Sequence, residues 1–258
     1  MGKTVMKHFF TLVFVLCIGI AVFLGWRLYE RQMDYKRGQE SLQEVYDLMQ
    51  DVDIEEAVGS EEDALKRRKL AQYAALHEEN PDMVGWIKIE GTTIDYPVMH
   101  TPEEPDYYLY RNFQKEKSAY GTIYIDSSCR LDGSSCSLLI YGHHMKNGDM
   151  FASLPEYDDP AYWKEHPEIE FSTLDEIGRY EVIAAFKQPA NRVDEDFMTM
   201  LRAGSKKQYN ELLGFMENYR FYDTGIEAQW PEQLITLATC EYTQKDGRFF
   251  VVARRIEE

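Results

Sequence analysis

The sequence is poor in cysteine and in basic residues, and both shortages exclude broad classes of protein. Four cysteines in 258 residues are too few for a disulfide-stabilised scaffold. Lysine and arginine total 28 against 45 aspartates and glutamates, a formal net charge of −17, whereas a nucleic-acid binder needs a basic surface. With 44% hydrophobic and 14% aromatic residues, the chain is instead an acidic globular protein.

Charge is absent from residues 9–26, which run from Phe9 to Trp26. As a helix, these 18 residues span about 27 Å, close to the thickness of a bilayer's hydrocarbon core. The lack of a polar face disfavours a buried core helix, and the lack of a small-residue cleavage site after Leu24 disfavours a cleaved signal peptide. We predict a single transmembrane anchor at residues 9–26, preceded by a cytoplasmic tail at residues 1–8. Because basic residues flank both ends of the span, charge does not fix its orientation.

Residues 27–80 are rich in charge and are expected to form a helical connector. Apolar residues recur at helical spacing over residues 42–49, and a break follows at residues 51–59. Ser60 then has the features of a helix cap, and Pro81 ends the second helical pattern. We therefore expect two helices that pack on the following domain.

From residue 81 to residue 258 the hydrophobic period changes from helical to two, which is typical of β-strands. Strand-like runs occur at residues 86–89, 94–98, 121–125, 137–141, 180–186, 234–239 and 249–253. Short strands separated by turns favour an all-β barrel or sandwich. Helical inserts are expected at residues 159–166 and 205–219, and the second of these stands before the strand that ends at a cysteine.

Three residues at predicted strand ends can carry chemistry. Cys240 ends an apolar run, His143 follows another run and a glycine, and Arg248 begins the last strand after the tight-turn signal Asp246-Gly247. Taken singly, each has a plainer interpretation: a buried inert cysteine, a histidine without a metal partner, and a surface arginine. Taken together, a thiol, an imidazole and a guanidinium at one end of a sheet can perform acyl transfer.

Four stretches of the sequence together resemble class B sortases, the membrane-anchored cysteine transpeptidases of Gram-positive bacteria. They are the domain opening at residues 80–98, the histidine motif Tyr-Gly-His-His-Met at 141–145, the Thr-Leu-Ala-Thr-Cys run at 236–240 and the arginine strand at 246–252. The resemblance implies a mainly β fold: a closed barrel of about eight strands at residues 81–258, with N-terminal helices and a helical insert before the cysteine strand.

The resemblance also implies roles for individual residues. Cys240 would be the nucleophile, His143 the general acid and base, and Arg248 the clamp for the oxyanion, while Thr239 and Glu241 beside the cysteine would contact substrate. Many class B enzymes have asparagine after the catalytic histidine, whereas this chain has a second histidine. The position in the motif still favours His143. No metal and no cofactor are expected.

The implied substrates are secreted proteins with a C-terminal sorting motif of the NPxTx or LPxTG type, cleaved after threonine through a thioester. The implied acceptor is an amine of a peptidoglycan precursor or of a pilin lysine. The resemblance places the enzyme in the cell membrane as a single-pass protein with an extracellular catalytic domain.

Two other classes remain open at this point. A papain-like peptidase has its cysteine before its histidine, and an L,D-transpeptidase has glycine before the cysteine, where this chain has Thr239. A non-enzymatic, membrane-anchored ectodomain would bury Cys240. Cys129 and Cys136 flank a short loop and can be either a disulfide or two free thiols.

Overall fold

The described part of the chain is built around eight β-strands. The computed structural model describes residues 2–50, 52, 60–241 and 247–256, with only the backbone described for residues 2–5 and 241. The strands are β1 (Met83–Lys88), β2 (Asp95–Met99), β3 (Ile123–Ile125), β4 (Ser137–Tyr141), β5 (Glu168–Thr173), β6 (Arg179–Gln188), β7 (Leu234–Glu241) and β8 (Gly247–Arg255). They close into one barrel in the order β1-β2-β3-β4-β7-β8-β6-β5, because β5 pairs with β1. The predicted mainly β barrel is thus confirmed.

Two neighbouring pairs in this barrel are parallel, β2 with β3 and β4 with β7, and the other pairs are antiparallel. A parallel pair needs a long crossover between its strands. Residues 142–233 provide it for β4 and β7, and this crossover carries β5, β6 and the helical insert. The chain therefore leaves β4 at one end of the barrel and enters β7 at the opposite end.

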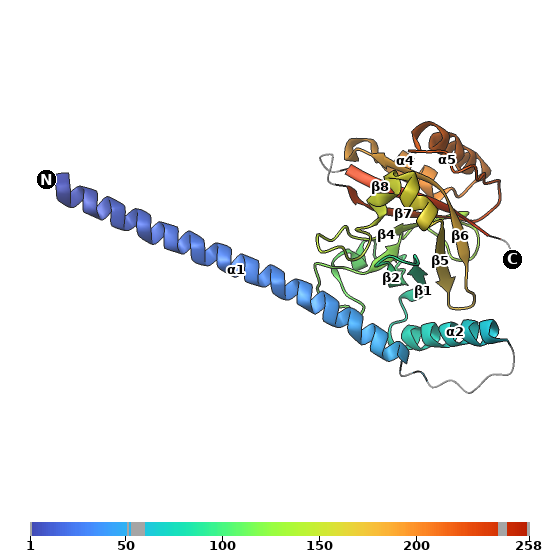
Figure 1. Cartoon of the computed structure of the whole chain (residues 1–258), viewed down its shortest axis with the longest axis horizontal. Coiled ribbons are helices and arrows are strands. Elements are labelled where there is room, and N and C mark those ends of the chain that lie inside the picture. The colour runs from blue at the N-terminus through green and yellow to red at the C-terminus, as the bar shows by residue number, and fades with distance from the viewer. Residues whose placement is uncertain (1, 51, 53–59, 242–246, 257–258) are drawn as a thin grey trace.

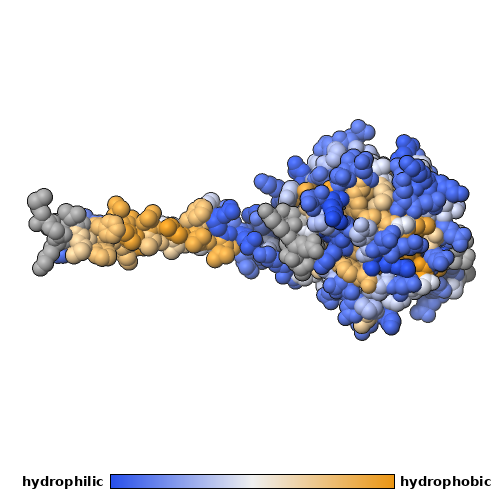
Figure 2. All heavy atoms as spheres, turned by 90° about the horizontal axis from the view of Figure 1, so that it is seen from above, coloured by the Kyte–Doolittle hydropathy of each residue, from blue (hydrophilic) through white to orange (hydrophobic). Residues whose placement is uncertain are grey.

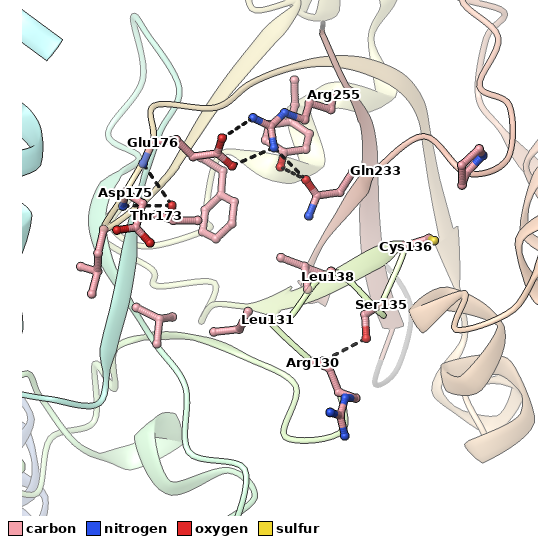
Figure 3. A pocket seen from close by; sticks show the side chains of 16 residues that line it. Arg130, Leu131, Ser135, Cys136, Leu138, Thr173, Asp175, Glu176, Gln233 and Arg255 are labelled. Carbon is pink, nitrogen blue, oxygen red and sulfur yellow. Dashed lines mark hydrogen bonds and ion pairs between the residues drawn. The ribbon is translucent and has the colours of Figure 1, made fainter.

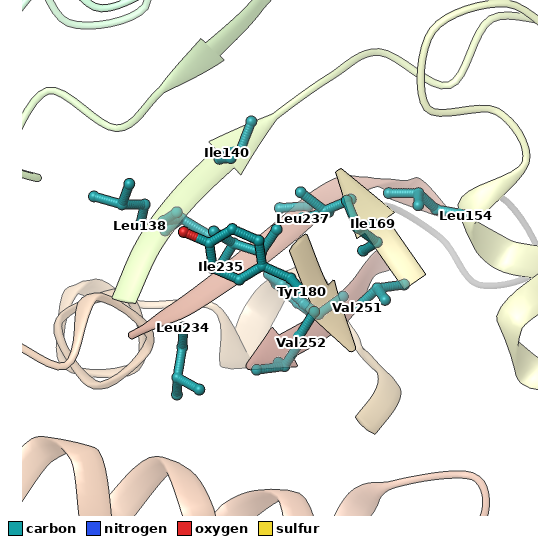
Figure 4. Close-up of a cluster of buried hydrophobic side chains, with 14 of the residues drawn as sticks. Leu138, Ile140, Leu154, Ile169, Tyr180, Leu234, Ile235, Leu237, Val251 and Val252 are labelled. Carbon is teal, nitrogen blue, oxygen red and sulfur yellow. The ribbon is translucent and has the colours of Figure 1, made fainter. Parts of the chain in front are cut away.

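The core is filled by branched apolar side chains from the sheet. Figure 4 shows Ile140 of β4, Ile235 and Leu237 of β7 and Val251 of β8 packed together, and all four are fully buried. Burial of each such side chain contributes roughly 1.5–3 kcal/mol. Alternation along the strands then sends Cys240 and Arg248 to the other face of the sheet from Leu237 and Val251.

The sequence runs identified seven of the eight strands and omitted β5. Strand β5 follows directly on a short helix and the sequence His166-Pro167, and only Ile169 and Phe171 give it an apolar face. Two alternating apolar residues are too few to predict a strand from the sequence. Strand β5 is stabilised by its pairing with β1 on one side and β6 on the other.

Helices cover parts of the barrel and extend from it. They are α1 (Gly2–Gln50), α2 (Glu61–Glu79), α3 (Pro160–Glu165), α4 (Glu195–Arg202) and α5 (Lys206–Tyr219), with short 3-10 turns η1 (Tyr107–Tyr110), η2 (Leu154–Asp158) and η3 (Ala190–Arg192). The insert before β7 contains two helices, α4 and α5, where the sequence predicted one. Phe197 of α4 packs edge-on against Phe250 of β8, with ring centres 5.5 Å apart, so this helix shields the outer face of the sheet.

Helix α1 is a single 49-residue rod that leaves the barrel (Figure 1). Its apolar part is exposed along its length and appears as a hydrophobic stalk in Figure 2, while hydrophilic side chains cover much of the domain seen in that view. By length and composition α1 is a candidate membrane anchor. The helix runs without a break past residue 26, so the predicted boundary between anchor and connector is not marked by any change of secondary structure. The predicted break at residues 51–59 lies almost wholly outside the described residues.

Helix α2 begins where the sequence predicts. Ser60 caps it by accepting a hydrogen bond from the Asp63 amide, and Asn80 ends it. Tyr73 of α2 stacks on Trp86 of β1 at 5.7 Å, which fixes the helix against the first strand. Helix α2 therefore packs on the barrel.

Cys129 and Cys136 are both free thiols, and both side chains are buried. Of the two possibilities left open by the sequence, the structure has the reduced one. Cys129 accepts a hydrogen bond from the Leu139 amide at 3.4 Å and so belongs to the packing around β4.

We expect Gly85→Ala to destabilise the domain, because a Cβ there would collide with the Ser172 carbonyl oxygen on β5 and open the seam that closes the barrel. Overpacking of this kind costs roughly 1–3 kcal/mol of the free energy of unfolding. The matched control is Gly214→Ala in α5, where a Cβ meets nothing within 4 Å and better helix propensity adds stability. Thermal unfolding of the detergent-solubilised chain should give a lower midpoint for the first variant and a higher one for the second. Equal midpoints would contradict the account of the seam.

Candidate active site

The pairing of β7 with β8 places Cys240 directly opposite Arg248. Directly paired residues of an antiparallel ladder have their side chains on the same face, with Cα atoms about 4.5–5.5 Å apart. The cysteine and the arginine are therefore neighbours at the end of the sheet, and both are only partly buried. The sulfur of Cys240 is not enclosed in the core, as a purely structural cysteine would be.

The pairing of β4 with β7 brings the histidine motif to the same place. Tyr141 pairs with Ala238, and the contact continues beyond the strand because the Gly142 amide donates to the Ala238 carbonyl at 3.1 Å. The Thr239 hydroxyl donates to the Gly142 carbonyl at 2.8 Å. Two residues further along both chains, His143 comes level with Cys240, so residues from three strand ends converge.

Gly142 is needed at this point for its small size. A Cβ there would lie 2.5 Å from the Ile123 side chain and 2.6 Å from the Phe151 ring. Any larger residue would push the chain away from β3 and from the turn that follows, and with it the histidine. The glycine therefore sets how closely His143 approaches the cysteine strand.

The ring of His143 is held by a hydrogen bond at its Nε2 atom. Its Nε2 atom lies 2.7 Å from the carbonyl oxygen of Leu109. Since a carbonyl only accepts, Nε2 carries a hydrogen, and Nδ1 is left as the nitrogen that exchanges a proton. The exposed ring of Tyr110 lies beside the imidazole, with ring centres 5.7 Å apart. Both contacts come from the end of η1.

The neighbouring His144 has a different environment. Its Nδ1 atom lies 3.0 Å from the backbone carbonyl oxygen of Cys240. The two adjacent histidines thus have different partners, one on η1 and one on the backbone of β7. His144 helps to tie the chain after β4 to the end of β7.

Thr239 and Glu241 flank the cysteine. The Thr239 side chain is 3% exposed and faces inward to Gly142, so its observed role is to join the two strands. Glu241 is the last residue of β7, and its side chain lies outside the part of the chain that the structure describes, as does Asp246 of the predicted turn.

Polar and aromatic side chains line the outer face next to the cysteine. Tyr124 and Tyr141 lie side by side on β3 and β4, with ring centres 5.2 Å apart. Burial is the main cause that raises the pKa of Tyr124, and smaller contributions come from its hydrogen bond to Asp106 and from the charge of a Cys240 thiolate. The tyrosine therefore stays protonated at neutral pH, next to the sulfur.

An ion pair anchors the helical insert beside this face. Arg202 at the end of α4 lies 3.1 Å from Asp126, and the two side chains are only 14% and 12% exposed. Tyr141 donates to the same carboxylate at 2.9 Å. Removing one partner of such a pair leaves the other charge uncompensated, so the pair fixes the insert relative to the end of β3.

A cavity of 680 Å³ lies at the other end of the barrel. Figure 3 shows Arg255 at the end of β8 bound to Glu176, and Cys136 and Gln233 just before β4 and β7. None of the predicted catalytic residues lines it. This cavity and the candidate catalytic residues are therefore separate.

A barrel with a parallel β4–β7 pair, a cysteine at the end of β7 and an arginine opposite it on β8 has the architecture of a sortase, a cysteine transpeptidase. The sortase domain family matches residues 87–256, well over half of the chain. The chain therefore belongs to the sortase family and is an enzyme, which rules out the non-enzymatic and other cysteine-enzyme alternatives.

The relatives that match most of the chain are sortases of class B. The chain is 26% identical to sortase B of Staphylococcus aureus over 98% of both chains, and 26% identical to sortase B of Listeria monocytogenes over 93% of both. Its structure resembles the crystal structure of sortase B from Bacillus anthracis, with a TM-score of 0.71, 27% identity, and coverage of 88% of this chain and 99% of the other. The predicted resemblance is confirmed.

Leu109 and Tyr110 were not among the residues that the sequence singled out. A backbone carbonyl has no signature in a sequence, and an exposed tyrosine in a loop is common. Their place beside His143 follows from the packing of η1 against β3 and from the hydrogen bond between the Thr122 amide and the Tyr108 carbonyl at 2.9 Å.

We expect thiol alkylation to distinguish Cys240 from Cys129. Burial raises the pKa of the Cys129 thiol to about 12, so at pH 8 roughly one part in ten thousand is thiolate. Iodoacetamide applied to the folded chain at pH 8 should modify Cys240, and peptide mapping should find Cys129 unmodified until the chain is unfolded in urea. Prompt labelling of Cys129 in the folded chain would contradict the burial, and protection of Cys240 would contradict its access.

Proposed function

We propose that Cys240 is the nucleophile of this sortase, with His143 as general acid and base and Arg248 as the oxyanion clamp. The observation that carries the proposal is the register: Cys240 pairs with Arg248, and the contact between β4 and β7 brings His143 level with the cysteine. The three groups match the needs of acyl transfer, which are a nucleophile, a proton carrier and a cation at the developing negative charge.

The first half of the reaction follows from these positions. The thiolate of Cys240 attacks the carbonyl carbon of the threonine in the sorting motif, and the Arg248 guanidinium hydrogen-bonds the oxyanion that forms. The protonated His143 gives its Nδ1 proton to the departing amine, the C–N bond breaks, and a thioester remains on Cys240. The Leu109 carbonyl supports this step because it accepts the Nε2 hydrogen in both protonation states of the ring.

In the second half an amine resolves the thioester. His143 takes the proton of the attacking amine, a new amide bond forms, and the C–S bond breaks to restore Cys240. The family's substrates carry sorting signals, and we propose a motif of the NPxTx or LPxTG type with an acceptor amine on a peptidoglycan precursor or a pilin lysine.

We further propose that residues 9–26 anchor the chain in the cell membrane and that residues 1–8 are cytoplasmic. The connector of residues 27–80 would then hold the catalytic domain of residues 81–258 outside the cell. The apolar part of α1 and the family of the chain support this placement.

The direct test is mass spectrometry of the products formed from a small pentapeptide library by the wild-type chain and by Cys240→Ala. We expect cleavage after threonine and a covalent adduct on Cys240 with the wild type, and neither with the variant. An adduct on another residue, or turnover by Cys240→Ala, would refute the assignment of the nucleophile.

We expect substitution of His143 and of His144 to affect activity differently. Replacing His143 with asparagine should lower kcat/KM by about 10²–10⁴, the usual contribution of a general acid and base. His144→Asn should retain most of the activity, because an asparagine amide can donate to the same Cys240 carbonyl. The pH–rate profile should lose its histidine-dependent limb only in the first variant. The reverse ranking of the two variants would move the catalytic role to His144.

Arg248→Lys should keep the charge and lose the planar fork that holds an oxyanion. We expect kcat to fall by about 10²–10³, the cost of losing one oxyanion donor. Alkylation of Cys240 by iodoacetamide should persist in this variant, which would show that the fold and the thiol are intact. Unchanged kcat would contradict the role of the guanidinium.

A further inference from the structure

A 560 Å³ cleft lies between the anchor helix and the histidine loop. One wall is formed by α1 between Leu24 and Tyr35, and the other by His143, His144, Met145 and Lys146. The predicted general base thus borders a space whose other side belongs to the membrane anchor and not to the barrel.

Packing further along α1 fixes the helix against the barrel. Tyr35 meets Tyr120 edge-on, with ring centres 5.7 Å apart. Gly38 lies so close to the same ring that a Cβ would be 2.5 Å from it, and the Ser41 hydroxyl hydrogen-bonds to Gln114. These contacts begin at Tyr35, where the cleft ends. The part of α1 that lines the cleft therefore directly precedes the part that is packed against the barrel.

The opposite wall is also held in place. The Tyr120 hydroxyl donates to Asp149 at 2.8 Å, and Asn147 donates to the same hydroxyl. The Met150 amide donates to the Tyr96 hydroxyl at 3.0 Å. One tyrosine, Tyr120, therefore contacts both the helix and the loop that enclose the cleft.

The charges of the cleft differ from those of the whole chain. Three basic residues, Arg27, Arg31 and Lys146, and two acids, Glu30 and Asp34, line the cleft, whereas the whole chain has 28 basic and 45 acidic residues. Asp34 also lies 3.6 Å from Arg37 on the same helix, outside the cleft. A locally cationic cleft on an acidic protein favours an acidic ligand.

We propose that this cleft receives the acceptor and that the acceptor carries acidic groups. Carboxylates of the acceptor bind Arg27, Arg31 and Lys146, and its amine reaches the thioester past His143. In that step the amine nitrogen bonds to the thioester carbon, its proton passes to His143, and the C–S bond breaks to release the Cys240 thiolate. The inference rests on the proposed function and adds the chemical class of the acceptor.

The cleft also lies next to the end of the apolar part of α1. Tyr35 stands nine positions after Trp26, which at the rise of an α-helix is about 14 Å. The cleft wall begins at Leu24, inside residues 9–26, so with that segment in the membrane the cleft lies at the bilayer surface and extends away from it.

The test compares two acceptors that differ only in charge, triglycyl-diglutamate amide and triglycyl-diglutamine amide. The full chain is reconstituted in phosphatidylcholine nanodiscs, and the ratio of kcat/KM for the two acceptors is measured with one sorting peptide. We expect the acidic acceptor to be preferred about threefold to tenfold, since exposed charge pairs contribute little each. Because both acceptors are measured on one preparation, the ratio does not depend on the active fraction.

Arg31→Gln should reduce this preference and Arg27→Gln with Arg31→Gln should abolish it. The matched control is Lys36→Gln on the same helix, where the lysine faces Glu40 at 3.6 Å and does not line the cleft, so the preference should persist. In the wild type, added salt should weaken the preference.

Hydroxylamine, a small nucleophile that is uncharged at neutral pH, separates the two possible failures. If the wild type forms the hydroxamate but shows no preference between the acceptors, or if Arg31→Gln and Lys36→Gln behave alike, the cleft does not bind the acceptor. If no thioester and no hydroxamate form, the proposed function itself fails.

Discussion

The register of three strands is the constraint on which the site depends. Strand β7 pairs in parallel with β4 and in antiparallel with β8, so the end of β4, the end of β7 and the start of β8 meet at one edge. A shift of β7 by a single residue would turn Cys240 into the barrel and bring Thr239 to the outer face. The apolar inner residues of β7 oppose that shift, because it would also expose Ile235 and Leu237.

The surroundings hold this edge rigid from several sides. The Arg202–Asp126 pair ties the insert to β3, and the Leu109 carbonyl fixes the ring of His143. These groups come from segments that lie far apart in the sequence, and the barrel brings them together. The reactive groups therefore sit on strand ends, while the contacts that orient them come from loops and helices.

The sequence was informative where local patterns carry the structure. Alternating apolar residues predicted most strands, Ser60 predicted the start of α2, and the motifs around His143 and Cys240 predicted the family. Strand β5 was missed because its stability comes from its two partners. Helix α4 was missed because it is only eight residues long, and its apolar side chains acquire a clear role only against the Phe250 side of the sheet.

Other features were beyond any local pattern. The hydrogen bond between Leu109 and His143 involves a backbone oxygen 34 residues away, and the cleft beside α1 needs the helix to continue unbroken past residue 26. The assignment of Cys240, His143 and Arg248 rests on residue types and register, and it agrees with the position of each residue in its motif.

The central claim is that these three side chains act on one carbonyl group, and a crystal structure of the chain alkylated on Cys240 by a threonine-ended peptide mimic tests it most directly. The account predicts that the Arg248 guanidinium donates to the carbonyl oxygen of the adduct and that Nδ1 of His143 faces the sulfur. An adduct whose carbonyl has no contact with Arg248, or a sulfur faced by His144 with His143 turned away, would contradict it.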